Sequence, residues 1–278
     1  KRRSFANSLT INGLGFVIFG FATAFLTLFF SYMAWWMLVV SLLLFVAFAF
    51  YINKASNPFI TPAFFKNTRW LRAICLILVF YFVNYALSPI FNAIGTNIYG
   101  MTTTQVSLHI VWAFVVAAVV GTCSGMIIRK IGIKAGIVTA GTLMFLGWTG
   151  AAFCVNSGFV VLTLCACVFY AGCGLMYSPV VSTVLGTIEK DESGRGVGMN
   201  DLAMNVSPSI GIAIIGSPLG SNALAGGSIT GATGTAANYA NLLLVAAGTA
   251  LLGLIVFFVF KKKIYEGNHA LETEESAK

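Results

Sequence analysis

Long apolar segments, separated by connections that carry almost all of the charge, are the feature that most constrains this chain. A helix needs about 20 predominantly apolar residues to cross a bilayer. Eight segments fit: residues 11–30, 35–52, 73–94, 106–128, 136–155, 159–185, 197–215 and 240–260. With 58% of its residues hydrophobic and 9% charged, the chain has a composition that soluble domains do not tolerate. The sequence therefore predicts an all-α polytopic membrane protein with eight transmembrane helices.

Basic residues cluster in every second connection, and the alternate connections carry no charge. The clusters are Lys1, Arg2 and Arg3; Lys54, Lys66, Arg69 and Arg72; Arg129, Lys130 and Lys134; Lys190 and Arg195; and Lys261, Lys262 and Lys263. By the positive-inside rule both ends are predicted to be cytoplasmic, as an even number of helices requires. The net charge of +8 then reflects membrane topology, and no nucleic-acid partner is expected.

The connections divide the chain into four predicted parts. Residues 1–53 form a helix pair, 54–72 a proline-containing cytoplasmic connector, 73–261 a six-helix bundle and 262–278 a polar cytoplasmic tail. The chain begins at Lys1, without a methionine or a signal-peptide pattern. We expect it to be a piece of a longer polypeptide.

Asp201 is the acidic residue that lies inside an apolar segment. At helical spacing it shares a small, polar stripe with Gly198, Asn205 and Ser209. A carboxylate inside a membrane span is costly and is typical of functional sites, so Asp201 is a candidate for proton coupling in transport. Alternatively, because Arg195 lies less than two helical turns away, Asp201 only pairs or caps at the cytoplasmic rim.

A second polar stripe follows the third apolar segment at spacings of three and four residues. It comprises Tyr81, Tyr85, Ser88, Asn92 and Thr96. Hydroxyl and amide groups on one helix face predict the wall of a substrate cavity. The alternative is that they hold helices together, at about 0.6 to 2 kcal/mol each. Pro89 frees a backbone carbonyl in this segment and predicts a bend.

Two further motifs concern the sixth segment and the turn after the fourth. The sixth places Tyr170, Cys173, Gly174 and Tyr177 on one face. Aromatic faces bind flat lipophilic or cationic molecules, although interhelical packing explains the same pattern. The turn contains Gly125, Arg129, Lys130 and Gly132. It predicts a tight turn of the chain whose hydrogen-bond donors point at the end of a neighbouring helix. The alternative is an ordinary cytoplasmic loop that is basic because of the positive-inside rule.

The sequence lacks the motifs that are typical of several classes of enzymes and metal-binding proteins. The sequence contains no nucleotide-binding glycine loop, no His or Cys cluster with metal-ligand spacing and no pair of carboxylates within apolar segments. The six cysteines are expected to pack within the membrane. The sequence therefore disfavours an enzyme and predicts no metal or other cofactor.

Four passages carry a family resemblance. They are residues 57–69 (NPFITPAFFKNTR) after a helix pair, residues 125–134 (GMIIRKIGIK), residues 196–202 (GVGMNDL) with 210–216 (IGIAIIG), and residues 239–244 (YANLLL). Together they resemble the C-terminal part of a major facilitator superfamily transporter, in the fourteen-helix branch of drug:proton antiporters. The chain departs from the pattern at Ile128 and Arg129, where the loop motif has its acid and adjoining residues. It also departs at Asp201, where a neutral polar residue is commoner.

The resemblance implies a fold, a function and partners. The last six helices would form the C-terminal bundle of a major facilitator fold, and the N-terminal half would be missing from this chain. Proton entry would drive export of lipophilic, often cationic drugs across the inner (plasma) membrane. The partners would be the lipid bilayer, the substrate, protons and the missing half.

The site expected from the stripes and the resemblance has three parts. The substrate cavity comprises Tyr81, Tyr85, Ser88, Asn92, Tyr177 and Asn205; the proton-coupling candidate is Asp201; and the gating loop comprises Gly125, Arg129, Lys130 and Gly132. Two alternatives remain open: a transporter of another metabolite, and a truncated membrane module that does not transport.

Overall fold

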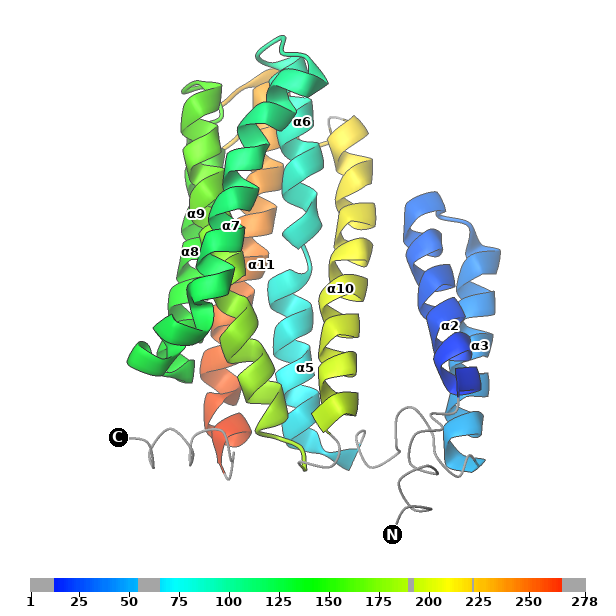
Figure 1. The fold of residues 1–278 in the computed structure, drawn as a ribbon. Coiled ribbons are helices and arrows are strands. Elements are labelled where there is room, and N and C mark those ends of the chain that lie inside the picture. Colours follow the sequence, from blue (N-terminus) through cyan, green and yellow to red (C-terminus); the bar gives the residue numbers. More distant parts are fainter. Residues whose placement is uncertain (1–12, 55–65, 190–192, 222, 267–278) are drawn as a thin grey trace. The chain divides into compact units, whose positions relative to one another are not determined.

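The helices form where the apolar segments predict them. The computed structural model describes residues 13–54, 66–189, 193–221 and 223–266, and within these ranges it is helical and contains no strand. The elements are α2 (Gly13–Tyr32), α3 (Trp35–Lys54), α5 (Thr68–Tyr81), η1 (Asn84–Ala86), α6 (Leu87–Asn97), α7 (Thr103–Ile131), α8 (Ile133–Phe153), α9 (Phe159–Leu185), α10 (Ser193–Ser221) and α11 (Gly234–Tyr265) (Figure 1). The protein is an all-α polytopic membrane protein.

These elements give seven to eight apolar helical stretches. In the part of the chain that the structure describes, seven helical stretches are long and apolar enough to cross a membrane, and α2 is apolar over Leu14–Phe30. The stretch Thr68–Asn97 counts as one span, although it consists of α5, η1 and α6. The eight predicted segments are therefore confirmed as helical, and the third of them is broken.

The chain divides into two compact units, Lys1–Leu71 and Arg72–Lys278. In the first unit, α2 and α3 form an antiparallel hairpin. Buried Ser41 donates a hydrogen bond of 2.8 Å to the carbonyl of Ala22, and the Phe19 ring meets Phe45 and Phe48 edge to face. The predicted connector overlaps residues 55–65, which lie outside the described residues.

The second unit holds the bundle, whose helices approach one another through glycines. A Cβ added to Gly174 on α9 would lie 2.5 Å from the carbonyl oxygen of Ala117 on α7, and one added to Gly172 would lie 2.7 Å from that of Ala140 on α8. In a membrane, helix association depends on such close packing, because lipid already solvates apolar side chains.

Phe80 anchors α5 in this bundle. Its ring is buried between two glycines, Gly141 on α8 and Gly253 on α11, where an added Cβ would lie 2.8 Å and 2.7 Å from the ring. The ring therefore occupies a space that exists because these two positions lack side chains.

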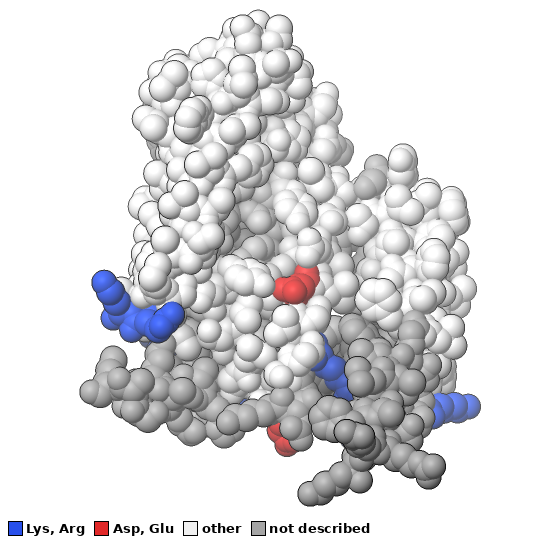
Figure 2. Space-filling model, in the orientation of Figure 1, with Lys and Arg blue, Asp and Glu red and all other residues white. Residues whose placement is uncertain are grey.

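Basic residues are confined to one end of the bundle. Figure 2 shows Lys and Arg in its lower part, an acidic patch on the face above them, and an uncharged surface above that patch. The basic residues lie where α5, α8 and α10 begin and where α7 and α11 end. At this end Lys134 lies 5.2 Å from the centre of the Tyr265 ring, and the Tyr265 hydroxyl is 2.9 Å from that of Thr183. Tyr265 thus joins the ends of α8, α9 and α11.

The helix ends show one local motif and bear on two predictions. At the start of α7, Thr102 and Gln105 exchange both hydrogen bonds of a capping box. The predicted turn from Gly125 is shorter than expected: Gly125, Arg129 and Lys130 lie within α7, and Gly132 alone links α7 to α8, with φ of 86°. The polar tail also starts later than residue 262, because α11 continues to Tyr265.

Replacing Gly147 by Leu should destabilise the bundle by about 1–3 kcal/mol through overpacking. A Cβ at Gly147 would lie 2.5 Å from the backbone nitrogen of Phe169, so α8 and α9 would have to separate. The matched control is Gly248→Leu on α11, where a Cβ meets nothing within 4 Å. Thermal unfolding of the detergent-solubilised protein measures the effect, and equal melting temperatures for the two variants would contradict this packing.

Candidate functional site

The break in the third span lies at the centre of the candidate site. α5 ends at Tyr81, Phe82 and Val83 form a turn, and one turn of 3-10 helix leads into α6. Pro89 lies in the first turn of α6, where its missing N–H needs no partner. The predicted bend is therefore a complete interruption placed before the proline, and a 3-10 turn within a longer helix is a common mark of functional positions.

Two positions on α10 accommodate the broken backbone. The Ser207 hydroxyl donates a hydrogen bond of 2.6 Å to the carbonyl of Leu78 in the last turn of α5. One turn later, the Cα of Gly211 packs against the carbonyl of Phe82, where a Cβ would overlap the oxygen. Irregular backbone inside a membrane must be covered by protein or water, and α10 provides part of that cover.

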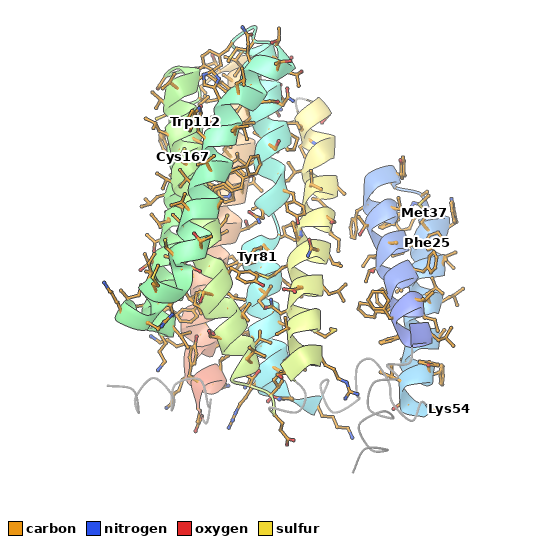
Figure 3. The ribbon with its side chains drawn as sticks, viewed as in Figure 1. Phe25, Met37, Lys54, Tyr81, Trp112 and Cys167 are labelled. Carbon is orange, nitrogen blue, oxygen red and sulfur yellow. The ribbon has the colours of Figure 1, made fainter. Side chains whose placement is uncertain are left out.

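Polar side chains of η1 reach two other helices. The Tyr85 hydroxyl donates to Oδ1 of Asn205 on α10 at 2.9 Å, and the Cys173 thiol on α9 donates to Oδ1 of Asn84 at 3.0 Å. Tyr81 is buried and lies near Tyr85, Cys173 and Tyr177; Figure 3 shows its side chain inside the bundle. The break thus gathers polar groups from α5, η1, α9 and α10.

Part of this group is open to a ligand. Tyr85 is 43% exposed and Tyr177 is 49% exposed, and Asn205 is also exposed, whereas Tyr81 is 6% exposed. The accessible groups are two aromatic rings with hydroxyls and one amide. Such a combination contacts a flat apolar or cationic molecule through the rings and orients it through hydrogen bonds.

The predicted stripe along the third span is wrong as a continuous face. The break separates Tyr81, which is buried, from Tyr85, which is exposed, and Ser88 and Asn92 follow on α6, both half-buried. Residues three or four apart share one face only in a continuous helix. Because this helix is broken, the predicted residues do not form one face. The structure brings Tyr85 together with Asn205 and places Ser88 and Asn92 on a separate helix.

The predicted stripe on α10 is present, with Asp201 half-buried within it. The amide of Asn205 donates to the main-chain carbonyl of Asp201 at 2.7 Å, and the Ser209 hydroxyl donates to that of Asn205 at 2.7 Å. The carboxylate itself accepts a bond of 3.2 Å from Nδ2 of Asn200. Asp201 is therefore held by amides of its own helix, two turns below the residues that cover the break.

Sequence reasoning missed Asn200, Ser207 and Gly211, which face the bundle interior. Ser207 and Gly211 are small residues four apart, and that spacing is a known signal of close helix contact. No sequence pattern marked Asn200, because it lies outside the polar stripe that contains Asp201.

The residues predicted to form a gating loop lie apart from this cluster, at the basic end of the bundle. Arg129 and Lys130 are exposed in the last turn of α7, and Gly132 follows them. Among the described residues, no group of three or more His, Cys, Asp or Glu side chains could hold a metal ion.

Comparison with known proteins gives distant relatives. The chain is similar to the multidrug resistance protein Stp of Mycobacterium tuberculosis, in strains CDC 1551 and H37Rv. Each is 23% identical to it over 169 residues, which are 60% of this chain and 31% of the relative. The match thus spans about a third of the length of these curated relatives. No family model matches the chain.

Replacing Ser207 by Ala should loosen the cover of the break. Loss of the hydrogen bond to Leu78 is expected to cost about 0.5–1.5 kcal/mol, and amide hydrogen exchange in residues 82–87 should speed up. Ser209→Ala is the matched control, because its hydroxyl bonds only to its own helix. Exchange rates unchanged by Ser207→Ala would show that α10 does not stabilise the break.

Proposed function

We propose that this chain is the C-terminal part of a secondary transporter that exports lipophilic, often cationic small molecules, in the manner of the major facilitator drug:proton antiporters. The observation that carries the proposal is the cluster at the helix break. There, exposed Tyr85, Tyr177 and Asn205 interrupt an apolar membrane bundle, and Asn205 lies about one helical turn from Asp201. Similarity to a multidrug resistance protein supports the same substrate class.

The chemistry of the cluster fits a substrate that is apolar, flat and positively charged. Tyrosine rings attract a cation through their faces. The hydroxyl of Tyr85 and the amide of Asn205 offer hydrogen bonds that substrates of different shapes can use. Few directed polar contacts among aromatic surfaces permit many related molecules to bind. We therefore place the drug next to η1, with Ser88 and Asn92 of α6 extending the same cavity.

Protons drive export in this proposal through Asp201. Binding a proton removes the charge of a carboxylate, so it changes which conformation of the surrounding helices is favoured. A ligand shifts a conformational equilibrium only by its difference in affinity between the two states. Asp201 supplies that difference if it faces the outer medium in one state and the cytoplasm in the other.

The membrane placement and the partners belong to the same proposal. The basic ends of the helices point to the cytoplasmic side of the inner (plasma) membrane, with Arg129, Lys130 and Gly132 at a gate between α7 and α8. A second bundle, which corresponds to the N-terminal half of such transporters, would close the open side of the cavity. A metabolite transporter would keep this architecture and change only the substrate.

Tyr85→Phe should weaken substrate binding about 3- to 10-fold, because it removes one hydrogen bond at the cavity. The readout is the KM for efflux of a fluorescent lipophilic cation from cells that express the full-length protein. The matched control is Tyr239→Phe, which also removes a Tyr–Asn hydrogen bond, of 2.6 Å to Asn97, away from the break. An equal effect of both substitutions would argue against a substrate site at η1.

Asp201→Asn should abolish export driven by a pH gradient, since an amide cannot bind and release the proton. Glu189→Gln, which removes an exposed carboxylate from the connection after α9, should leave export intact. Efflux is measured in cells with and without a protonophore, across a broad panel of drugs. Protonophore-insensitive export, or full export by Asp201→Asn, would remove this carboxylate from the mechanism. Absence of export for every drug would favour another substrate or a module that does not transport.

A further inference from the structure

Asn200 is a buried amide whose oxygen has no partner. The residue is 0% exposed, on the interior face of α10 next to Asp201. Its Nδ2 donates to Oδ1 of Asp201 at 3.2 Å and to Sδ of Met204 at 3.2 Å, while its own Oδ1 accepts no hydrogen bond. Buried amide oxygens are almost always paired, so an exception requires a physical explanation.

The carboxylate of Asp201 is the group that holds the amide in its present orientation. A thioether is a weak acceptor, so the contact with Met204 contributes little. Because Oδ1 has no donor, no bond on the other side of the amide resists a half-turn about the Cβ–Cγ bond. The orientation of Asn200 therefore depends on the charge of its neighbour.

Protonation of Asp201 adds a donor that the carboxylate lacks. An ionised carboxylate only accepts hydrogen bonds, whereas a protonated carboxyl group still accepts at its carbonyl oxygen and also donates one bond through its O–H. An asparagine amide can meet either need, because it presents a donor on one side and an acceptor on the other. A half-turn brings Oδ1 of Asn200 to the position from which Nδ2 now donates.

We propose that Asn200 is a positioning residue for the proton site at Asp201: its amide donates to the ionised carboxylate and, after a half-turn, accepts from the protonated carboxyl group. This inference rests on the proposed role of Asp201 in proton coupling. It adds a second residue to that site and explains why an unpaired amide oxygen is retained beside it.

The half-turn transmits the protonation state into the packed interior. With Asp201 ionised, the unpaired atom that faces the bundle is an oxygen; with Asp201 protonated, it is an NH₂ group. An unpaired buried donor needs a hydrogen-bond acceptor, whereas an unpaired buried acceptor needs a donor, and either group is costly while it stays unpaired. The two protonation states therefore favour different packing of α10, which is what coupling requires.

Other titratable and charged groups lie on α10 and on the elements packed around it. They are Arg69, Arg72, Cys75 and Tyr81 on α5, Tyr85 in η1, Cys165, Cys167, Tyr170, Cys173 and Tyr177 on α9, Arg195 on α10 itself, and Tyr239, Lys261, Lys262, Lys263 and Tyr265 on α11. None is a carboxyl group. The infrared carbonyl band of protonated Asp201 can therefore be followed without overlap from them.

The test is infrared difference spectroscopy of the full-length protein between acidic and neutral pH, with asparagine labelled by ¹³C at the side-chain carbonyl. We expect an amide carbonyl band to shift together with the appearance of the Asp201 carboxyl band, since both follow one proton. Asn200→Leu should abolish the amide shift and move the carboxyl band to higher frequency, because the O–H loses its acceptor. Asn205→Leu, whose amide bonds the main chain of Asp201, should retain the amide shift.

The outcomes separate this inference from the proposed function. A carboxyl band of Asp201 that appears with no change in any asparagine band overturns the role of Asn200 and leaves proton coupling intact. Absence of the Asp201 band overturns both, and the efflux assay then shows independently whether protons drive export. The labelled wild-type spectrum alone decides the matter if Asn200→Leu does not fold.

Discussion

A broken helix inside a membrane requires another element to cover its backbone, and the site depends on that cover. Lipid offers no hydrogen bonds to an exposed carbonyl, so a turn such as Phe82–Val83 is stable only against protein or water. Ser207 and Gly211 of α10 meet this requirement with a hydroxyl and with the absence of a side chain. With the turn stabilised in this way, Asn84 and Tyr85 can point to α9 and α10 instead of continuing a helical surface.

Glycine has the same role elsewhere in the bundle. Gly147, Gly172 and Gly174 permit α7, α8 and α9 to approach to backbone contact, and Gly141 and Gly253 leave room for the ring of Phe80. Composition alone does not reveal this use, because most of the 29 glycines are spread among apolar residues. The contacts are specific pairs between helices, and each pair fixes the depth of one helix against its neighbour.

The spans could be predicted from sequence because the bilayer sets their length and composition, and the capping box at Thr102 because its pattern is local. The break could not be located. Pro89 signalled an irregularity, but the interruption lies at Phe82–Val83, where long-range contacts with Gly211 and Ser207 decide the backbone. For the same reason Tyr85 was placed incorrectly on a line through Tyr81, and its role in a substrate cavity stays a prediction. Asn200 was missed because its significance comes from an unpaired oxygen, which only a three-dimensional arrangement reveals.

The one-residue link at Gly132 has a mechanical consequence. A single glycine between α7 and α8 leaves too little chain for these helices to slide past each other, and the glycine contacts of α9 lock it to both. These three helices are suited to act as one rigid lever. The third span, by contrast, contains a joint at its middle. We expect this span to bend at η1, so the molecule proposed to bind beside Tyr85 would lie next to that joint.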